Sequence, residues 1–271
     1  MNARKKKPIS PMRVKIGFVI FAALATALVS ALAKPPPPHA QATRASLAAL
    51  PPTMLWAWER PERLDRIDAD RTGIAFLART LYLRGDEVIV RPRLQLLDIP
   101  QRAALMAVVR IESDPRENPT LSRIQTERSV VAIAEMARLD NVRAVQIDFD
   151  AVRSERDFYR DLLGSLRQTL GRTTPISITA LASWCIHDEW LDRLPIDEAV
   201  PMLFRMGVGH REVVNYLKTH MRFRAAACQD SIGISTDEPL PRLPPHQRTY
   251  VFNPKSWTPE TVRGAMKEST R

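Results

Sequence analysis

Two aspartates at the end of a short apolar stretch are the residues best placed to do chemistry. The stretch from Arg143 to Ala151 reads Arg-Ala-Val-Gln-Ile-Asp-Phe-Asp-Ala. Side chains alternate between the two faces of a strand, so Asp148 and Asp150 share one face and the apolar residues share the other. At the carboxyl end of a strand in a parallel α/β protein, inward positions open into the active site. The pattern therefore predicts a catalytic or ligand-binding role for both aspartates.

Paired carboxylates are suited to general acid and base catalysis. Two inward carboxylates whose Cα atoms lie about 6.5 to 7 Å apart repel each other, which raises the pKa of at least one unless Arg110 or Arg205 intervenes. Acid and base roles separate when the environments of the two groups differ, and glycoside hydrolysis is the commonest use of such a pair. The structural alternative is that Asp148 and Asp150 cap the next helix or pair with an arginine.

Further charged and aromatic residues end other apolar stretches of the chain. We expect them to form one polar cleft, because the carboxyl ends of the strands meet at one face of a parallel barrel. Asp237 and Glu238 are the second candidate catalytic pair. The alternative role of these charged residues is ion pairing within the rim, of Arg110 with Glu112 or of Arg205 with an acid. The candidate substrate-binding residues are Glu59, Arg110, Glu112, Trp184, Arg205, Asn253 and Trp257.

Tryptophan rings offer flat surfaces on which sugar rings stack. Trp184 and Trp257 each follow a predicted strand and are assigned this role. Trp56 and Trp58 lie in the first predicted strand and are not assigned it, since we expect Trp56 in the core.

The spacing of the apolar stretches predicts the elements that position these residues. Eight short strands in about 220 residues, separated by helix-like or loop segments, fit an α/β fold with a compact (β/α)8 TIM-like barrel. A doubly wound open sheet is the alternative, but the chain has nine glycines and no glycine-rich phosphate loop. The predicted strands are residues 54–58, 73–77, 104–111, 144–150, 176–182, 199–204, 232–235 and 250–252.

The helical patterns are uneven, so we expect a partly degenerate barrel. Thr258, followed by proline and glutamate, is typical of a helix start. A hairpin is predicted at residues 80–91 around Arg84-Gly85-Asp86, and residues 239–245 hold too many prolines for a helix. The predicted helices are residues 126–139, 155–170, 210–220 and 258–267, with weaker patterns at 61–67 and 188–194.

The N-terminal residues predict export. Six Lys and Arg precede residues 16–33, an uncharged run of 18 residues that is about the minimum for spanning a bilayer. Residues 1–33 are therefore a signal anchor, or a signal peptide cleaved after Ala31-Leu32-Ala33. Residues 34–52 include four consecutive prolines and predict a stiff linker, which leaves residues 53–271 for the barrel domain.

The charge distribution excludes a nucleic-acid partner. The chain carries a formal net charge of +10, but the six basic residues before the apolar run supply most of it. The remaining charge forms neither a basic run nor a pattern interleaved with aromatic residues. The five histidines are scattered and no Gly-x-Ser-x-Gly motif occurs, so we expect no metal, no cofactor and no serine hydrolase. A divalent ion on Asp148 and Asp150 is a minor alternative.

Cys185 and Cys228 are the only cysteines, and an exported compartment would let them pair. In a barrel, Cys185 follows the fifth strand at the top, whereas Cys228 precedes the seventh strand at the bottom. Their Cα atoms would then lie beyond the limit of about 7 Å for a disulfide. We therefore expect no bridge, unless the loop before the seventh strand climbs the barrel.

Four segments together resemble the bacterial domain of unknown function 3142 family, over roughly Thr53 to Lys267. The family name carries no reaction, and the resemblance implies a single domain. The segments are Val145-Gln-Ile-Asp-Phe-Asp-Ala, Ile178-Thr-Ala-Leu-Ala-Ser-Trp184, Pro201-Met-Leu-Phe-Arg-Met-Gly207 and Ser231-Ile-Gly-Ile-Ser-Thr-Asp-Glu-Pro239.

At the level of the fold, the fourth strand resembles that of the chitinase-type glycosidases, which ends Asp-x-Asp-x-Glu with the glutamate as the acid. Asp148 and Asp150 match the first two acids, but Val152 stands at the glutamate position. The resemblance then implies that the proton donor is Asp150, or that it is Asp237 or Glu238 from another strand.

The sequence thus predicts a metal-independent, glycoside-hydrolase-like enzyme of the cell envelope that acts on a poly- or oligosaccharide through Asp148 and Asp150. Its second expected partner is the cytoplasmic membrane, which it contacts through the N-terminal segment. The domain would be periplasmic, or secreted if the signal is cleaved. The alternative, favoured by Val152, is a catalytically silent polysaccharide-binding or envelope-structural protein on the same barrel. The sequence assigns no oligomeric state.

A reporter enzyme fused after Arg271 should be active on the outer side of the cytoplasmic membrane, because a basic flank before an apolar segment stays in the cytoplasm. Activity of a reporter that works only in the cytoplasm would contradict this topology. Washing the membranes with carbonate then separates the two alternatives, since a retained anchor stays with the membrane and a cleaved chain is released.

Overall fold

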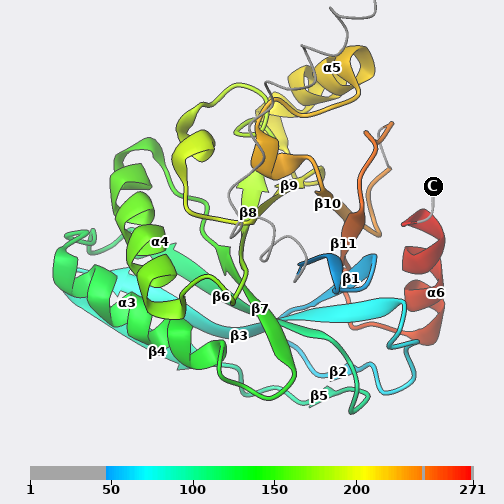
Figure 1. Cartoon of the computed structure of the whole chain (residues 1–271), viewed down its shortest axis with the longest axis horizontal. Helices are drawn as coiled ribbons and strands as arrows, with labels where there is room; N and C mark the ends of the chain where they lie inside the picture. Colours follow the sequence, from blue (N-terminus) through cyan, green and yellow to red (C-terminus); the bar gives the residue numbers. More distant parts are fainter. Residues whose placement is uncertain (1–46, 240–241, 270–271) are drawn as a thin grey trace, which may run out of the picture. The chain divides into compact units, whose positions relative to one another are not determined.

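The computed structural model of the protein describes residues 47–239 and 242–269 (Figure 1). Eight parallel strands form its centre. In chain order they are β1 (Thr53–Ala57), β3 (Thr72–Arg84), β6 (Leu105–Ser113), β7 (Val142–Asp148), β8 (Ile176–Leu181), β9 (Glu198–Met202), β10 (Ser231–Ser235) and β11 (Arg248–Phe252). All eight predicted strands are confirmed, with ends shifted by a few residues and with β3 extended by the hairpin that follows it.

The sheet closes on itself, because β1 pairs in parallel with both β11 and β3. The described residues contain four α-helices, which are α3 (Arg123–Met136), α4 (Arg156–Leu170), α5 (His210–His220) and α6 (Pro259–Glu268). The fold is therefore a closed eight-stranded barrel with half of the usual helices, a partial TIM-like barrel. This confirms the predicted fold class and excludes the doubly wound open sheet.

The helices begin where the sequence supplies capping residues. Ser122 accepts a hydrogen bond from the backbone of Gln125 at the start of α3, and the Gln125 side chain accepts one in return. Thr258 caps α6 and Pro259 occupies its first turn, as predicted. Helices α3 and α4 pack side by side, and α3 contacts β3, β7 and the edge strand β4 (Glu87–Pro92) (Figure 1).

Two weak helical patterns were wrong. Residues 61–67 contain β2 (Glu62–Arg63), which pairs in parallel with β5 (Leu97–Asp98), and residues 188–194 contain a single 3₁₀ turn, η2 (Trp190–Arg193). Both segments are too short to bury a helical face, and each carries several charged residues. The predicted hairpin is confirmed, since β3 turns through Gly85-Asp86 into the antiparallel strand β4 (Glu87–Pro92). Gly85 has a φ of 48°, which favours glycine.

Side chains of the strands alternate between two separate cores. One lies inside the barrel and includes Met54, Trp56, Met106 and Tyr250, and the larger one lies between the barrel and the outer elements. Val145, Ile147 and Phe149 belong to the outer core, so the predicted faces of β7 are confirmed.

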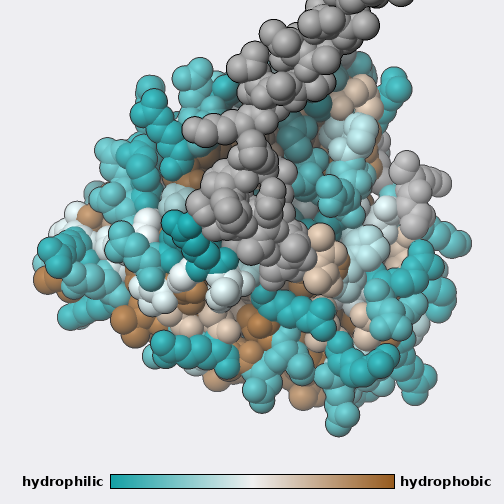
Figure 2. All heavy atoms as spheres, viewed as in Figure 1, coloured by the Kyte–Doolittle hydropathy of each residue, from teal (hydrophilic) through white to brown (hydrophobic). Residues whose placement is uncertain are grey.

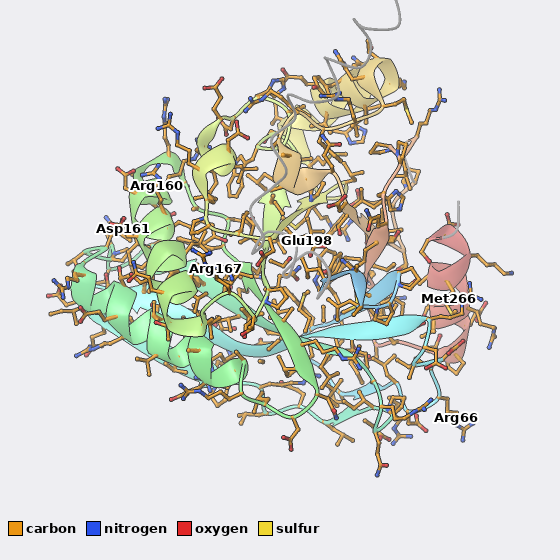
Figure 3. The ribbon with its side chains drawn as sticks, in the orientation of Figure 1. Arg66, Arg160, Asp161, Arg167, Glu198 and Met266 are labelled. Carbon is orange, nitrogen blue, oxygen red and sulfur yellow. A yellow bond between two sulfur atoms is a disulfide. The ribbon has the colours of Figure 1, made fainter. Side chains whose placement is uncertain are left out.

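A buried ion pair occupies the lower part of the barrel interior. Arg248 Nη1 lies 2.9 Å from Glu198 Oε1, and both side chains are almost fully buried. The two carboxylate oxygens of Glu198 also accept hydrogen bonds from the hydroxyl groups of Ser177, Ser231 and Tyr250. Figure 3 labels Glu198 in the centre of the strands. The charge of Glu198 is thus matched by an arginine and three hydroxyl donors, as burial away from water requires.

Hydrogen bonds extend this network upward. The side chain of Gln146 donates to Ser177 Oγ at 3.1 Å and accepts from Trp56 Nε1 at 2.8 Å. Downward, Arg248 donates to the carbonyl oxygens of Leu47 and Pro51. The side chains of Leu47 and Leu50 are buried in the inner core, so the packed domain includes the end of the stretch that we assigned to a linker.

The two cysteines form a disulfide, contrary to the expectation from topology. The Cα atoms of Cys185 and Cys228 lie 6.0 Å apart. The loop before β10 rises along the barrel, and the backbone N–H groups of Arg224 and Ala225 donate to the carbonyl oxygen of Cys185. The exception that we allowed for the loop is the arrangement found.

None of the helices in the described ranges is long and apolar enough to cross a membrane. The predicted signal segment, residues 1–33, and most of the predicted linker lie outside the described residues. Their assignment stays a prediction.

Replacing Glu198 with glutamine should lower the free energy of unfolding by about 3 to 5 kcal/mol, because Arg248 would keep its charge in a buried site without a carboxylate. Chemical denaturation measures this change. Arg66→Gln is the matched control, since the Arg66 side chain is exposed and a change within about 0.5 kcal/mol is expected. A loss below about 1 kcal/mol for Glu198→Gln would show that the ion pair does not hold the interior.

Candidate functional site

A cleft of about 390 Å³ opens at the carboxyl ends of the barrel strands, within the size range of ligand sites. Asp148 and Asp150 lie on one wall together with Arg110 and Thr179. Aromatic and aliphatic side chains form the rest of the lining, so the cleft has a small polar wall and a larger apolar one. The apolar wall consists of Trp56, Trp58, Leu181, Met202, Phe204, Met206, Val213 and Phe252.

Asp148 is the deeper acid and is held from both sides. Thr179 Oγ1 donates a hydrogen bond of 2.6 Å to Asp148 Oδ1. Arg110 Nη1, on the neighbouring strand, lies 3.8 Å from Asp148 Oδ2, and Arg110 Nε lies 2.6 Å from Glu112 Oε1. The predicted pairing of Arg110 with Glu112 is therefore present, and the same arginine reaches the first aspartate.

Asp150 lies nearer the mouth and is exposed to solvent. Its carboxylate forms no hydrogen bond or ion pair with any residue that the structure describes. Burial raises the pKa of Asp148 above its ordinary value, and the nearby Asp150 raises it further, while the bond from Thr179 opposes the shift. Partial burial of the carboxyl group at the cleft also raises the pKa of Asp150, against the attraction of Arg110. Both shifts favour the protonated form.

A second hollow of about 440 Å³ adjoins the first and shares Arg110, Asp148 and Asp150 with it. Glu112 and Glu155 also line it, so this side is rich in carboxylates. Glu155 is buried and accepts hydrogen bonds from Ser113 Oγ and from the backbone N–H of Val152. The nearest acid after Val152 therefore caps its own helical turn. The two aspartates lie at the junction of an apolar hollow and a polar one.

The aromatic wall comes from three strand ends that sequence analysis did not combine. The rings of Phe204 and Phe252 are stacked with centroids 5.5 Å apart, and Trp58 meets Phe252 edge to face at 6.4 Å. Trp56 forms part of the floor, where its ring lies 5.3 Å from Tyr250. Flat apolar rings opposite carboxylates suit a ligand with one apolar face and polar edges, such as a sugar.

The second candidate acid pair does not line the cleft. Arg205, which does, lies 2.7 Å from Asp237 through Nη2 and bonds Glu238 through Nη1. Ser235 Oγ also donates to Asp237. The hydrogen bonds from Arg205 and Ser235 lower the pKa of Asp237, so this carboxylate is unsuited to donate a proton. The rim ion pair that we considered as the alternative is the arrangement found.

The remaining predicted site residues lie outside the lining of both hollows. Trp184 and Trp257 are buried, Trp184 against Trp190 and Trp257 with its Nε1 donating to the carbonyl of Trp56, so neither offers a ring to the cleft. Asn253 is buried in the turn after β11, where its amide donates to two backbone carbonyls. Glu59 is exposed. Trp184 and Trp257 are therefore not placed to stack on a ligand in the cleft, whereas Trp58, Phe204 and Phe252 line it.

Alternation along each strand was the signal for the missed residues. Thr179 shares the inward face of β8 with Ser177, and Trp58 follows Trp56 on the inward face of β1. Trp184 and Trp257 lie beyond their strands, where strand alternation no longer indicates direction. Following the inward face of each predicted strand to its last residue identifies the aromatic wall.

No family model, curated protein or solved structure matches this chain in the comparisons. The barrel supports a TIM-like architecture and no finer classification, so the resemblance to the domain of unknown function 3142 family stays a prediction. Within residues 47–239 and 242–269, no group of three or more His, Cys, Asp and Glu side chains is arranged to hold a metal ion.

Replacing Asp150 with asparagine should raise the melting temperature of the protein near pH 7. The raised pKa means that the folded state holds this proton more tightly than the unfolded state does. Ionisation of Asp150 therefore lowers the free energy of unfolding as the pH rises through the pKa of the folded state. Below the ordinary pKa of 3.8 the group is protonated in both states, and this loss disappears. Thermal unfolding at about pH 7 and pH 3 checks both limits.

Asp157→Asn is the control for this measurement, since Asp157 is an exposed aspartate that pairs with Arg160 on α4. No gain is expected there. A clear drop in melting temperature for Asp150→Asn at neutral pH would mean that Asp150 is a structural residue.

Proposed function

We propose that this protein is a glycoside-hydrolase-like enzyme of the cell envelope that acts on a poly- or oligosaccharide. One observation carries the proposal. The carboxyl group of Asp150 has a raised pKa and no hydrogen bond or ion pair with a described residue, and it lies at the carboxyl end of a barrel strand, opposite a wall of stacked aromatic rings. A general acid needs a raised pKa and freedom to reach the leaving oxygen; burial raises the pKa of Asp150, and no described residue binds its carboxyl group.

The roles of the neighbouring groups follow from their contacts. Asp150 donates the proton to the glycosidic oxygen, since no hydrogen bond with a described residue holds it in place. Asp148, fixed by Thr179 and Arg110, lies beneath the reacting sugar and orients it through its carboxyl group. The aromatic wall orients the sugar ring by its apolar face.

A second function is favoured by a specific observation. Val152 stands where the chitinase pattern has its acid, and Glu155 is tied to Ser113 and to the backbone of its own turn. If the second carboxylate needed for hydrolysis is missing, the cleft binds carbohydrate without cleaving it. The catalytically silent polysaccharide-binding protein is therefore the alternative.

A screen of the purified full chain against bacterial and plant polysaccharides separates the two functions. New reducing ends are measured beside simple retention on the insoluble polymer. Release of reducing ends supports the enzyme, retention without cleavage supports the binding protein, and neither result with any polymer contradicts both.

With a cleaved polymer, Asp150→Asn should reduce turnover by about 10² or more while retention stays largely unchanged, because the substitution removes the proton and keeps the shape.

Wild-type turnover should fall as the pH rises through the raised pKa of Asp150, since only the protonated form is active. Trp58→Ala should instead weaken retention. Asp157→Asn, whose residue lies on α4 and lines neither hollow, is the control, and unchanged turnover of Asp150→Asn would remove Asp150 from the mechanism.

A further inference from the structure

Strand β4 is the last strand of the nine-stranded sheet, and its outer edge has no partner strand among the described residues. Its inner edge pairs with β3, from Glu87 opposite Arg84 to Pro92 opposite Arg79. The two-residue turn makes Arg84 and Glu87 a hydrogen-bonded pair, and hydrogen-bonded and non-hydrogen-bonded pairs alternate along an antiparallel ladder. Val88 and Val90 therefore direct their N–H and C=O groups away from β3. The edge is thus a template for one more antiparallel strand.

Exposed apolar side chains concentrate beside this edge. Six of the ten exposed large hydrophobic residues in the described ranges lie on β4, in the segment after it or on α3. A groove of about 410 Å³ between β4 and α3 is lined by Val90 and Val131. Figure 1 shows β4 at the margin of the ribbon below α3, and Figure 2 shows hydrophobic residues at the surface along this margin. The six residues, which we call the β4 patch, are Ile89, Val90, Leu94, Leu96, Ile124 and Val131.

The sequence of β4 is complementary to itself in one antiparallel register. Its residues 87–91 read Glu-Val-Ile-Val-Arg, with opposite charges placed symmetrically about Ile89. Two copies paired about Ile89 bring each Glu87 opposite Arg91 of the partner subunit, and Val88 opposite Val90 of the partner subunit. The valine pairs then exchange the outward hydrogen bonds, while the charged pairs and the isoleucines occupy the closer, non-hydrogen-bonded positions.

We propose that the protein forms a two-fold symmetric homodimer through antiparallel pairing of its β4 strands, centred on Ile89. The pairing satisfies the open edge of each sheet and covers part of the β4 patch, which a monomer leaves in water. Charges on an edge strand commonly prevent pairing. In the register centred on Ile89, Glu87 and Arg91 of the two copies form pairs of opposite charge. A shifted register would separate these pairs, so the two charged residues favour this one pairing.

The charged residues of β4 have weak competitors within the chain. Arg91 is exposed, and its side chain interacts with the hydroxyl group of Tyr82 and with the charges of Glu59 and Glu112, while Glu87 lies near Arg84. Exposed pairs of this kind contribute little, so they leave both residues available to a second copy. The proposal concerns a face other than the cleft and does not rest on the proposed function.

Cysteine crosslinking tests the centre of the interface. The native cysteines are bonded to each other, so Ile89→Cys introduces the one free thiol of the described residues. Directly opposed, non-hydrogen-bonded positions have Cα atoms about 4.5 Å apart, which a disulfide spans. Mild oxidation of the full chain should therefore give a covalent dimer in high yield. Val90→Cys, whose copies lie diagonally about 7 to 8 Å apart, and Val208→Cys, which is exposed on another loop, are the controls.

Charge reversal tests the register. In sedimentation of the full chain in a mild detergent, the wild type should be a dimer. Glu87→Arg and Arg91→Glu should each weaken the dimer about tenfold or more, because each places two like-charged pairs across the interface. The double variant should restore it, since the pairs are opposite again. Thermal unfolding checks that every variant is folded.

A monomeric wild type overturns the proposal. So does a dimer that ignores both single reversals and fails to crosslink at residue 89, since that dimer uses another part of the chain. Equal crosslinking at residues 89 and 208 would show random collision and would also overturn it.

Discussion

The ion pair between Glu198 and Arg248 is the constraint on which the barrel interior depends. Removing two charges from water is costly, and here the cost is offset because Glu198 also accepts three hydroxyl hydrogen bonds. The network continues through Ser177 and Gln146 to the indole of Trp56, which forms the cleft floor. Gly233 gives that indole room, since a Cβ there would lie 2.8 Å from the ring. The position of the floor is thus set from below by polar contacts.

The upper end of the barrel treats its two acid pairs differently. Asp237 and Glu238 share Arg205, whose backbone lies in the left-handed region at a φ of 52° and whose N–H also donates to Glu238. Arg110 interacts with both Asp148 and Asp150. It pairs with Asp148 at 3.8 Å, attracts the charge of Asp150 and also pairs with Glu112. Each acid pair has one arginine, but the arginine at β7 also pairs with Glu112, so the excess of negative charge is larger there. Burial in the cleft raises the pKa of both aspartates and the charge of Asp150 raises that of Asp148 further, and groups with raised pKa values are typical of functional sites.

Alternation and capping residues were enough to predict the barrel, its main helices and the inward direction of Asp148 and Asp150. These features are local, since a strand face or a helix cap is set by residues that are close in sequence. Pairing across the barrel was not predictable in the same way. Arg248 and Glu198 are 50 residues apart, and the contact of Cys185 with Cys228 depends on the path of a loop. For Asp237, the sequence supplied the partner Arg205 but not the choice between catalysis and ion pairing.

The aromatic wall shows why a barrel with few helices still presents a defined cleft. No helix follows β1, and Trp58 lies at its end. The guanidinium of Arg93 instead donates to the carbonyl oxygens of Ala57, Trp58 and Arg60, and so fixes the backbone that carries the indole. On the opposite side, the disulfide at Cys185 holds the turn whose Ala182 and Ser183 line the cleft. Arginine-to-carbonyl bonds and a covalent bridge thus replace helices as supports, and such supports leave no periodic pattern in the sequence.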